Sequence, residues 1–207
     1  MRHILNLLTA LAAIVLFAAC EKDLIPQEGI VMTNPDKIQG TYVITGTHSY
    51  IEKTTKWLST PPQGQYRVFF TNMEVNGNVC NIADKHPVFV GESTFTVTSS
   101  TQRETISVPV REITCHLSFK QTDGVKISNI LVSGIPTVLF IDGEFDQFTS
   151  KQLDGDSYVV ATQIEVSICI INELNAEMKV LKTRINAQPG CKYSLKVGKD
   201  NISISSE

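Results

Sequence analysis

A strand-like alternation of apolar and polar residues runs along the chain from Ile38 onward, and it constrains the fold more than any other feature. It is clearest in Ile113–Lys120, Gln163–Ile170 and Cys191–Val197. Alternation with one polar side is typical of antiparallel sheets that have one face on a core and the other in water. The sequence therefore predicts an all-β fold, an antiparallel two-sheet β-sandwich.

Turn signals and a change of phase divide this pattern into strands. One short helix is expected at Ile51–Ser59. The apolar phase shifts at Arg111-Glu112, which predicts a bulge or bend where the chain passes from one sheet to another. Dipeptides typical of tight hairpin turns lie between the other predicted strands: Asn76-Gly77, Asp123-Gly124, Asp142-Gly143 and Asp154-Gly155.

The first residues resemble a lipoprotein signal peptide. Arg2 precedes an apolar stretch, Ile4–Ala19, which ends in small residues before Cys20. This stretch is shorter than the roughly 18 residues that a membrane-spanning helix needs. We expect cleavage before Cys20 and a lipid on that cysteine. An ordinary secretory signal beside a chance cysteine is the alternative.

Three regions follow from these signals. Residues 1–19 are the expected signal peptide, residues 20–37 a flexible tether, and residues 38–207 one β-sandwich domain. We expect the domain to be held at the outer membrane through the lipid on Cys20, on the cell surface. The charged residues that follow, Glu21-Lys22-Asp23, resemble a surface-sorting signal.

Four cysteines remain beyond the leader: Cys80, Cys115, Cys169 and Cys191. In an oxidising compartment an even number suggests up to two disulfides, and four cysteines allow three pairings. Without a CxxC pair, the spacing argues against structural zinc. Cys115 and Cys191 share the apolar faces of their strands, which fits either a core disulfide or two buried thiols.

No pattern in the sequence indicates catalysis. The histidines His48, His86 and His116 lack patterned acidic or cysteine partners. A nucleophile elbow, a phosphate-binding loop and an HExxH helix are all missing. The formal net charge is −3 and there is no basic run, so nucleic acid is not an expected partner. We expect a protein that is not an enzyme and has no cofactor.

Two short segments could form binding sites of other kinds. The acidic run Asp142–Asp146 has the alternate spacing of a calcium loop, but it lacks the glycine and closing glutamate of an EF-hand. An acidic hairpin turn is therefore the default, and no metal site is predicted. Trp57, with Tyr50 and Tyr66, could form an aromatic platform for glycans, although a single tryptophan in a sandwich is more often half-buried.

Several segments resemble fimbrillin-type proteins, the subunits and lipoprotein anchors of the type V pili of Bacteroidota. They occur in the family's order: Gly64–Asn72, Val108–Phe119, Ile127–Leu139 and Gln188–Val197. The resemblance implies a transthyretin-like β-sandwich that assembles by accepting or donating a strand. Family members usually have two such domains, whereas we expect one here from the chain length.

The resemblance implies a non-enzymatic role in pilus assembly, anchoring or adhesion, with pilus subunits as partners through strand complementation. The alternative is a lipid-anchored glycan-binding module of a polysaccharide-uptake system, with Trp57 at its centre. An unpaired sheet edge would favour the first function, and coplanar exposed aromatic rings would favour the second.

Overall fold

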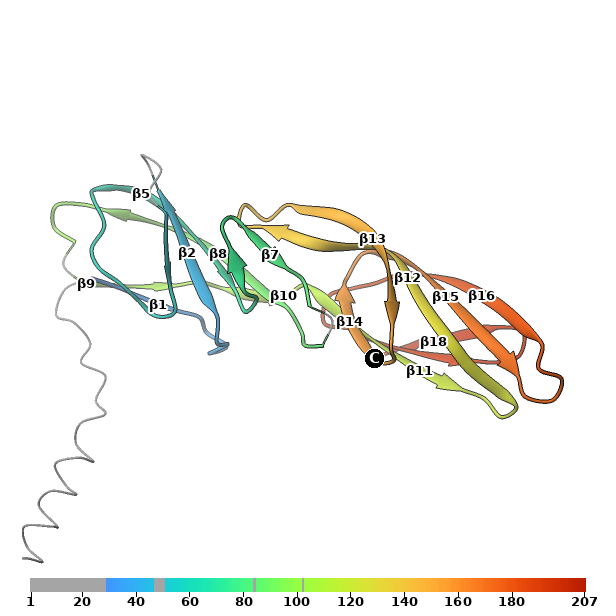
Figure 1. Cartoon of the computed structure of the whole chain (residues 1–207). Helices are drawn as coiled ribbons and strands as arrows, with labels where there is room; N and C mark the ends of the chain where they lie inside the picture. The colour runs from blue at the N-terminus through green and yellow to red at the C-terminus, as the bar shows by residue number, and fades with distance from the viewer. Residues whose placement is uncertain (1–28, 47–50, 84, 102) are drawn as a thin grey trace, which may run out of the picture.

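The computed structural model describes residues 29–46, 51–83, 85–101 and 103–207, and it is an elongated pair of β-sandwiches (Figure 1). The regular elements of these residues are all strands, so the predicted all-β class is confirmed. This part of the chain has no helix long and apolar enough to cross a membrane.

The first sandwich is formed by sheet A, with strand order β4-β1-β9, and sheet B, with order β10-β8-β5-β2-β3. Its strands are β1 (Gly29–Thr33), β2 (Thr41–Gly46), β3 (Ile51–Thr54), β4 (Trp57–Leu58), β5 (Gly64–Thr71), β8 (Phe89–Val97), β9 (Arg103–Ser107) and β10 (Val110–Glu112). The two sheets enclose a core that includes Ile30, Ile44 and Phe70.

The second sandwich is formed by sheet C, with order β16-β15-β12-β7-β6, and sheet D, with order β14-β11-β17-β18; β13 pairs with β12. Its strands are β6 (Val75–Asn76), β7 (Val79–Asn81), β11 (Thr114–Gln121), β12 (Val125–Phe140), β13 (Phe145–Leu153), β14 (Ser157–Val160), β15 (Gln163–Asn172), β16 (Met178–Asn186), β17 (Lys192–Val197) and β18 (Ile202–Ser206). The core between sheets C and D includes Leu117, Ile168 and Leu195.

The structure thus differs from the single sandwich expected for residues 38–207. Two separate cores form because the chain changes sheets at the predicted bend: β10 ends at Glu112 in sheet B, and β11 begins at Thr114 in sheet D. Apolar alternation marks the inner face of each strand but carries no information about which other strands share that core. The sequence pattern was therefore compatible with one core or two.

The expected tether at 20–37 also needs correction. Within it, Gly29–Thr33 is β1, which pairs with β4 and runs parallel to β9. Ile30 and Met32 of β1 are fully buried. Two alternate apolar residues are too few to reveal a strand by periodicity, which explains the error. Residues 20–28 lie outside the described part of the chain.

The short helix expected at Ile51–Ser59 is wrong. The segment forms β3 and β4, joined by a tight turn in which the Thr54 hydroxyl accepts a hydrogen bond from the Trp57 N–H at 3.0 Å. A threonine side chain that bonds to nearby backbone groups competes with helical hydrogen bonding. This local bond and the β-branched pair Thr54-Thr55 favour the turn.

A third apolar cluster joins the two sandwiches. Val43, Phe69 and Val90 lie on sheet B, and they pack with Leu139 of β12 and Cys80 of β7. The chain also crosses over at this point, because the short hairpin β6–β7 precedes β8 in sequence but pairs with β12 of the second sandwich. Packing and main-chain pairing thus hold the two halves together.

Candidate assembly surface

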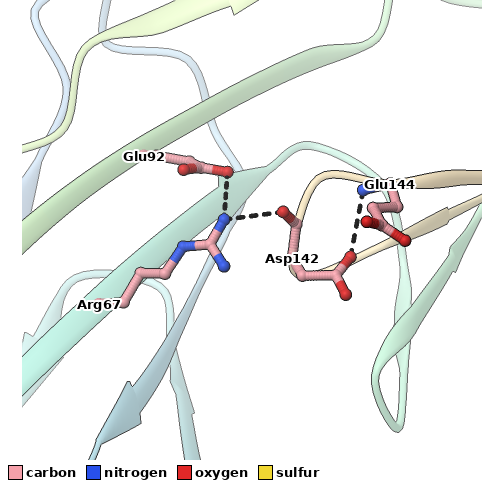
Figure 2. Close-up of polar contacts among 4 residues, drawn as sticks. All are labelled: Arg67, Glu92, Asp142 and Glu144. Carbon is pink, nitrogen blue, oxygen red and sulfur yellow. Dashed lines mark hydrogen bonds and ion pairs between the residues drawn. The ribbon is translucent and has the colours of Figure 1, made fainter.

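A polar clamp closes the junction between the two sandwiches (Figure 2). Arg67 of β5 donates from Nη2 to Glu92 Oε1 of β8 at 2.6 Å and to the Asp142 carbonyl at 2.8 Å. Asp142 lies in the turn between β12 and β13, so the clamp ties that hairpin to sheet B. Its residues are partly exposed, and we expect the clamp to orient the hairpin more than to stabilise the fold.

The clamp also explains the acidic run considered as a calcium loop. The Asp142 carboxylate accepts a hydrogen bond from the Glu144 N–H at 3.1 Å, which closes a hairpin turn. Within the described residues no cluster of three or more histidine, cysteine or acidic side chains could hold a metal ion. The run is an acidic turn that docks on Arg67.

Two residues of the predicted glycan platform, Trp57 and Tyr66, lie within the described chain. Tyr66 is only 3% exposed; its ring stacks on Phe95, and its hydroxyl donates to the Pro62 carbonyl at 2.7 Å. Trp57 is half-buried on β4, and its ring lies over Gly29, where an added Cβ would collide with it. Tyr50 lies outside the described residues. Tyr66 therefore belongs to the core of the first sandwich, whereas Trp57 packs over Gly29 beside the inward-facing Leu58.

In the structure no disulfide joins the four cysteines of the described chain, which lie in three different surroundings. Cys80 lies in the junction cluster, Cys169 is half-buried on β15, and Cys115 and Cys191 contact the core of the second sandwich. Burial raises the pKa of Cys115 to about 12 and that of Cys80 to about 11. Both thiols stay protonated near neutral pH and are poor nucleophiles in the folded protein. Cys20 lies outside the described residues.

Sheet C offers two long open edges, β16 and β13, which the sequence analysis did not single out. Each is nine residues long. Among the described strands, β16 pairs only with β15, and β13 pairs only with β12. A strand edge without a neighbour presents main-chain N–H and C=O groups that can pair with a strand of another chain.

Two hydrogen bonds reveal which residues of β16 face the open edge. The Asn172 N–H donates to the Glu177 carbonyl at 2.9 Å, and the Ala187 N–H donates to the Thr162 carbonyl at 3.0 Å. These bonds mark hydrogen-bonded positions at both ends of the β15–β16 ladder. Because antiparallel pairs alternate, the odd-numbered residues of β16 pair with β15. The even-numbered residues direct their main-chain groups away from β15: Met178, Val180, Lys182, Arg184 and Asn186.

The side chains of β16 make this edge both apolar and basic. Met178 is 65% and Val180 58% exposed, whereas Leu181 and Ile185 are buried in the core. Lys182 and Arg184 form ion pairs with Glu165 at 3.5 and 3.4 Å, but both remain largely exposed. Cations placed along an edge disfavour pairing with an identical strand, because like charges would then lie close together.

The edge of β13 is less regular. Phe148 is 60% exposed, and Phe145 is also exposed. Gln147 has a positive φ of 55°, and the register between β12 and β13 skips it between Pro136↔Phe148 and Val138↔Asp146. Such an irregularity interrupts the row of edge groups and makes pairing with a further strand less favourable. Of the two edges, β16 is the better candidate for assembly.

The architecture defines the chain as a tandem β-sandwich protein, and the solved structures that share this fold include the following three. One is a fimbrial assembly protein from Parabacteroides distasonis, with 13% identity, a TM-score of 0.57 and coverage of 87% of this chain and 94% of that chain. A second, from Bacteroides eggerthii and provisionally assigned to cell adhesion, has 8% identity, a TM-score of 0.54 and coverage of 86% and 93%.

The third is the fimbrial anchor protein Mfa2 from Porphyromonas gingivalis, with 9% identity, a TM-score of 0.50 and coverage of 81% of this chain and 90% of that chain. No protein-family model and no curated protein matches the sequence. The fold implied by the fimbrillin-type resemblance is therefore confirmed by structural similarity, at identities where only the fold is shared.

Proposed function

We propose that this chain is a lipid-anchored cell-surface protein with a non-enzymatic role in pilus assembly, anchoring or adhesion. The observation that carries the proposal is the open edge of β16, on a fold shared with a fimbrial assembly protein and a fimbrial anchor protein. An exposed edge captures an extended segment of a partner through main-chain hydrogen bonds, and side chains along the edge select that segment.

The arrangement of the two sandwiches suits this role. The described chain begins with β1 in one sandwich, and β16 lies in the other (Figure 1). A lipid on Cys20 would hold the first sandwich near the membrane. The second sandwich would then project away from it and present β16 to a partner on the cell surface.

The chemistry of β16 specifies the kind of strand that it would capture. Met178 and Val180 offer apolar contacts on one face of the sheet, and Lys182 and Arg184 add positive charge. A complementary strand would carry apolar residues at alternate positions and at least one carboxylate near Lys182. Opposite charges on neighbouring strands stabilise pairing by roughly 0.2–1 kcal/mol per pair, so charge would add selectivity to the main-chain bonds.

Val180→Pro tests the edge directly. Proline removes the Val180 N–H, which faces the open edge, and leaves the N–H groups that pair with β15 in place. With a photo-crosslinking residue in place of the exposed Asn186, which also faces the open edge, in the full-length chain on its own cells, we expect one pilus subunit to be crosslinked. This product should fall at least tenfold in Val180→Pro.

Val180→Thr is the matched control, since it keeps the N–H and should retain capture. The same crosslinker at the exposed Ile51, in the other sandwich, should not yield that product. Equal crosslinking in folded Val180→Pro would rule out β16 as the docking edge. Retention by a surface polysaccharide in affinity electrophoresis, lost in Trp57→Ala, would instead support the glycan-binding alternative.

A second prediction concerns the anchor. Cys20→Ala should abolish incorporation of labelled fatty acid and release the protein from the membrane fraction, because the lipid is the expected hydrophobic tether after cleavage. Metabolic labelling and fractionation measure both effects. Stable membrane association of a Cys20→Ala chain whose signal has been removed would contradict the lipoprotein assignment.

A further inference from the structure

Cys115 lies on β11, and Cys191 lies directly before β17, the neighbouring strand of sheet D. β11 and β17 run parallel, and His116 pairs with Lys192 one residue beyond the two cysteines. The His116 N–H donates to the Cys191 carbonyl at 3.0 Å, and the Gly190 N–H donates to the Thr114 carbonyl at 2.8 Å. These bonds flank the pair and keep the two backbones close to the spacing of adjacent strands, roughly 5 Å. The register slips by one residue between them, because the Cys191 N–H donates to the Gln188 carbonyl and not to Thr114.

Both side chains face the same core. Cys115 is fully buried in the core of the second sandwich, and Cys191 packs against that cluster while remaining partly exposed. Adjacent strands bring Cα atoms within the roughly 4.4–6.8 Å that a disulfide requires, and side chains on a common face can converge. The strand spacing and the shared face therefore favour a bond between the two thiols, which are unbonded in the structure.

The other two cysteines have no such partner within the described chain. Cys80 belongs to the junction cluster. Cys169 lies outside the core cluster, because the inward positions of β15 are the even-numbered residues such as Ile168 and Ile170. Of the three pairings that the sequence left open, only the one containing Cys115–Cys191 joins two cysteines of the same cluster.

We infer that Cys115 and Cys191 form an intramolecular disulfide when the chain matures in an oxidising compartment. This inference goes beyond the proposed function and depends only on the secretion predicted from residues 1–19. Two S–H bonds break and one Sγ–Sγ bond forms. The two electrons and the two protons pass to a disulfide oxidant, such as glutathione disulfide, whose S–S bond breaks to give two thiols.

The order of the steps follows from accessibility. Cys191 is the more exposed thiol and attacks the oxidant first, forming a mixed disulfide. The Cys115 thiolate then attacks the Cys191 sulfur of that mixed disulfide and releases the second thiol of the oxidant. Because burial raises the pKa of Cys115, its thiolate is scarce in the folded protein, so the bond forms as β17 docks on β11 during folding.

The bond would tie together β11 and β17, the two central strands of sheet D. It also closes most of the second sandwich into one covalent loop, which restricts the unfolded chain. Disulfides that close long loops typically raise the ratio of folded to unfolded protein by about 30- to 1000-fold. The second sandwich would thereby be reinforced between the anchored half and a partner on β16.

The test is a peptide map of the mature full-length protein, extracted from its cells in the presence of iodoacetamide and denatured without reductant. We expect a crosslinked peptide pair containing Cys115 and Cys191, with alkyl label on Cys80 and Cys169. Alkyl label on both Cys115 and Cys191, or a crosslink of either to another cysteine, would overturn the inference.

A refolding experiment tests whether the disulfide forms without secretion. Reduced protein refolded in a glutathione redox buffer should regain the same crosslink, and a reductant should then lower its urea midpoint. Cys169→Ser should behave like the parent chain, whereas Cys191→Ser should not respond to reductant. A midpoint that is insensitive to reductant in both the parent chain and Cys169→Ser would contradict a stabilising bond. If Cys191→Ser fails to fold, the peptide map still decides.

Discussion

Ile168→Ala should lower the free energy of unfolding by about 2–5 kcal/mol, because truncation of a buried isoleucine loses transfer free energy and leaves a cavity. Ile168 lies at the centre of β15, fully buried between sheets C and D. Urea denaturation followed by circular dichroism gives the loss as a shift in midpoint at constant slope.

The matched control is Val180, on the neighbouring strand β16. Val180 adjoins Leu181, the register partner of Ile168, but its side chain is exposed on the outer face. Val180→Ala also removes apolar carbon, yet we expect a loss within about 0.5 kcal/mol, as for other exposed positions. Equal losses for the two variants would mean that the strand faces are assigned wrongly.

Leu139→Ala should be similarly costly, by about 2–5 kcal/mol, for a different reason. Leu139 is buried in the junction cluster, so its truncation weakens the contact between the two sandwiches. We expect the loss to appear as separation of one cooperative unfolding transition into two. Calorimetry measures this separation, because it compares the calorimetric with the van't Hoff enthalpy.

Arg67→Ala is the control at the same junction. It removes the ion pair with Glu92 and the hydrogen bond to Asp142, both of which lie at a partly exposed site. Exposed ion pairs contribute roughly 0–1 kcal/mol, so the change should be small and should leave unfolding cooperative. A larger effect from Arg67→Ala than from Leu139→Ala would indicate that the polar clamp, not the apolar cluster, joins the sandwiches.

The features of the fold that the sequence predicts correctly depend on residues that are close together along one strand. In β15 the alternation places Ile164, Val166, Ile168 and Ile170 on one face, and all four are buried. The phase shift at Arg111-Glu112 likewise falls where the chain leaves sheet B for sheet D. Period-two alternation is a local property, so the sequence displays it directly.

The features of the fold that the sequence did not predict depend on contacts between residues far apart in the chain. The Arg67–Asp142 hydrogen bond spans 75 positions, and β1 is a strand because it lies between β4 and β9. The burial of Tyr66, one residue of the predicted aromatic platform, also depends on a distant contact, since its ring packs against Phe95. No local pattern distinguishes such contacts from other arrangements of the same strands.

The sequence by itself determined the all-β class, the inner face of the long strands and the expectation of a secreted, lipid-anchored chain. Only the tertiary structure decided that there are two cores, that Cys115 lies beside Cys191, and that β16 has an open edge. The physical reason is that side-chain periodicity selects a face, whereas strand pairing selects a partner through main-chain bonds common to nearly all residues.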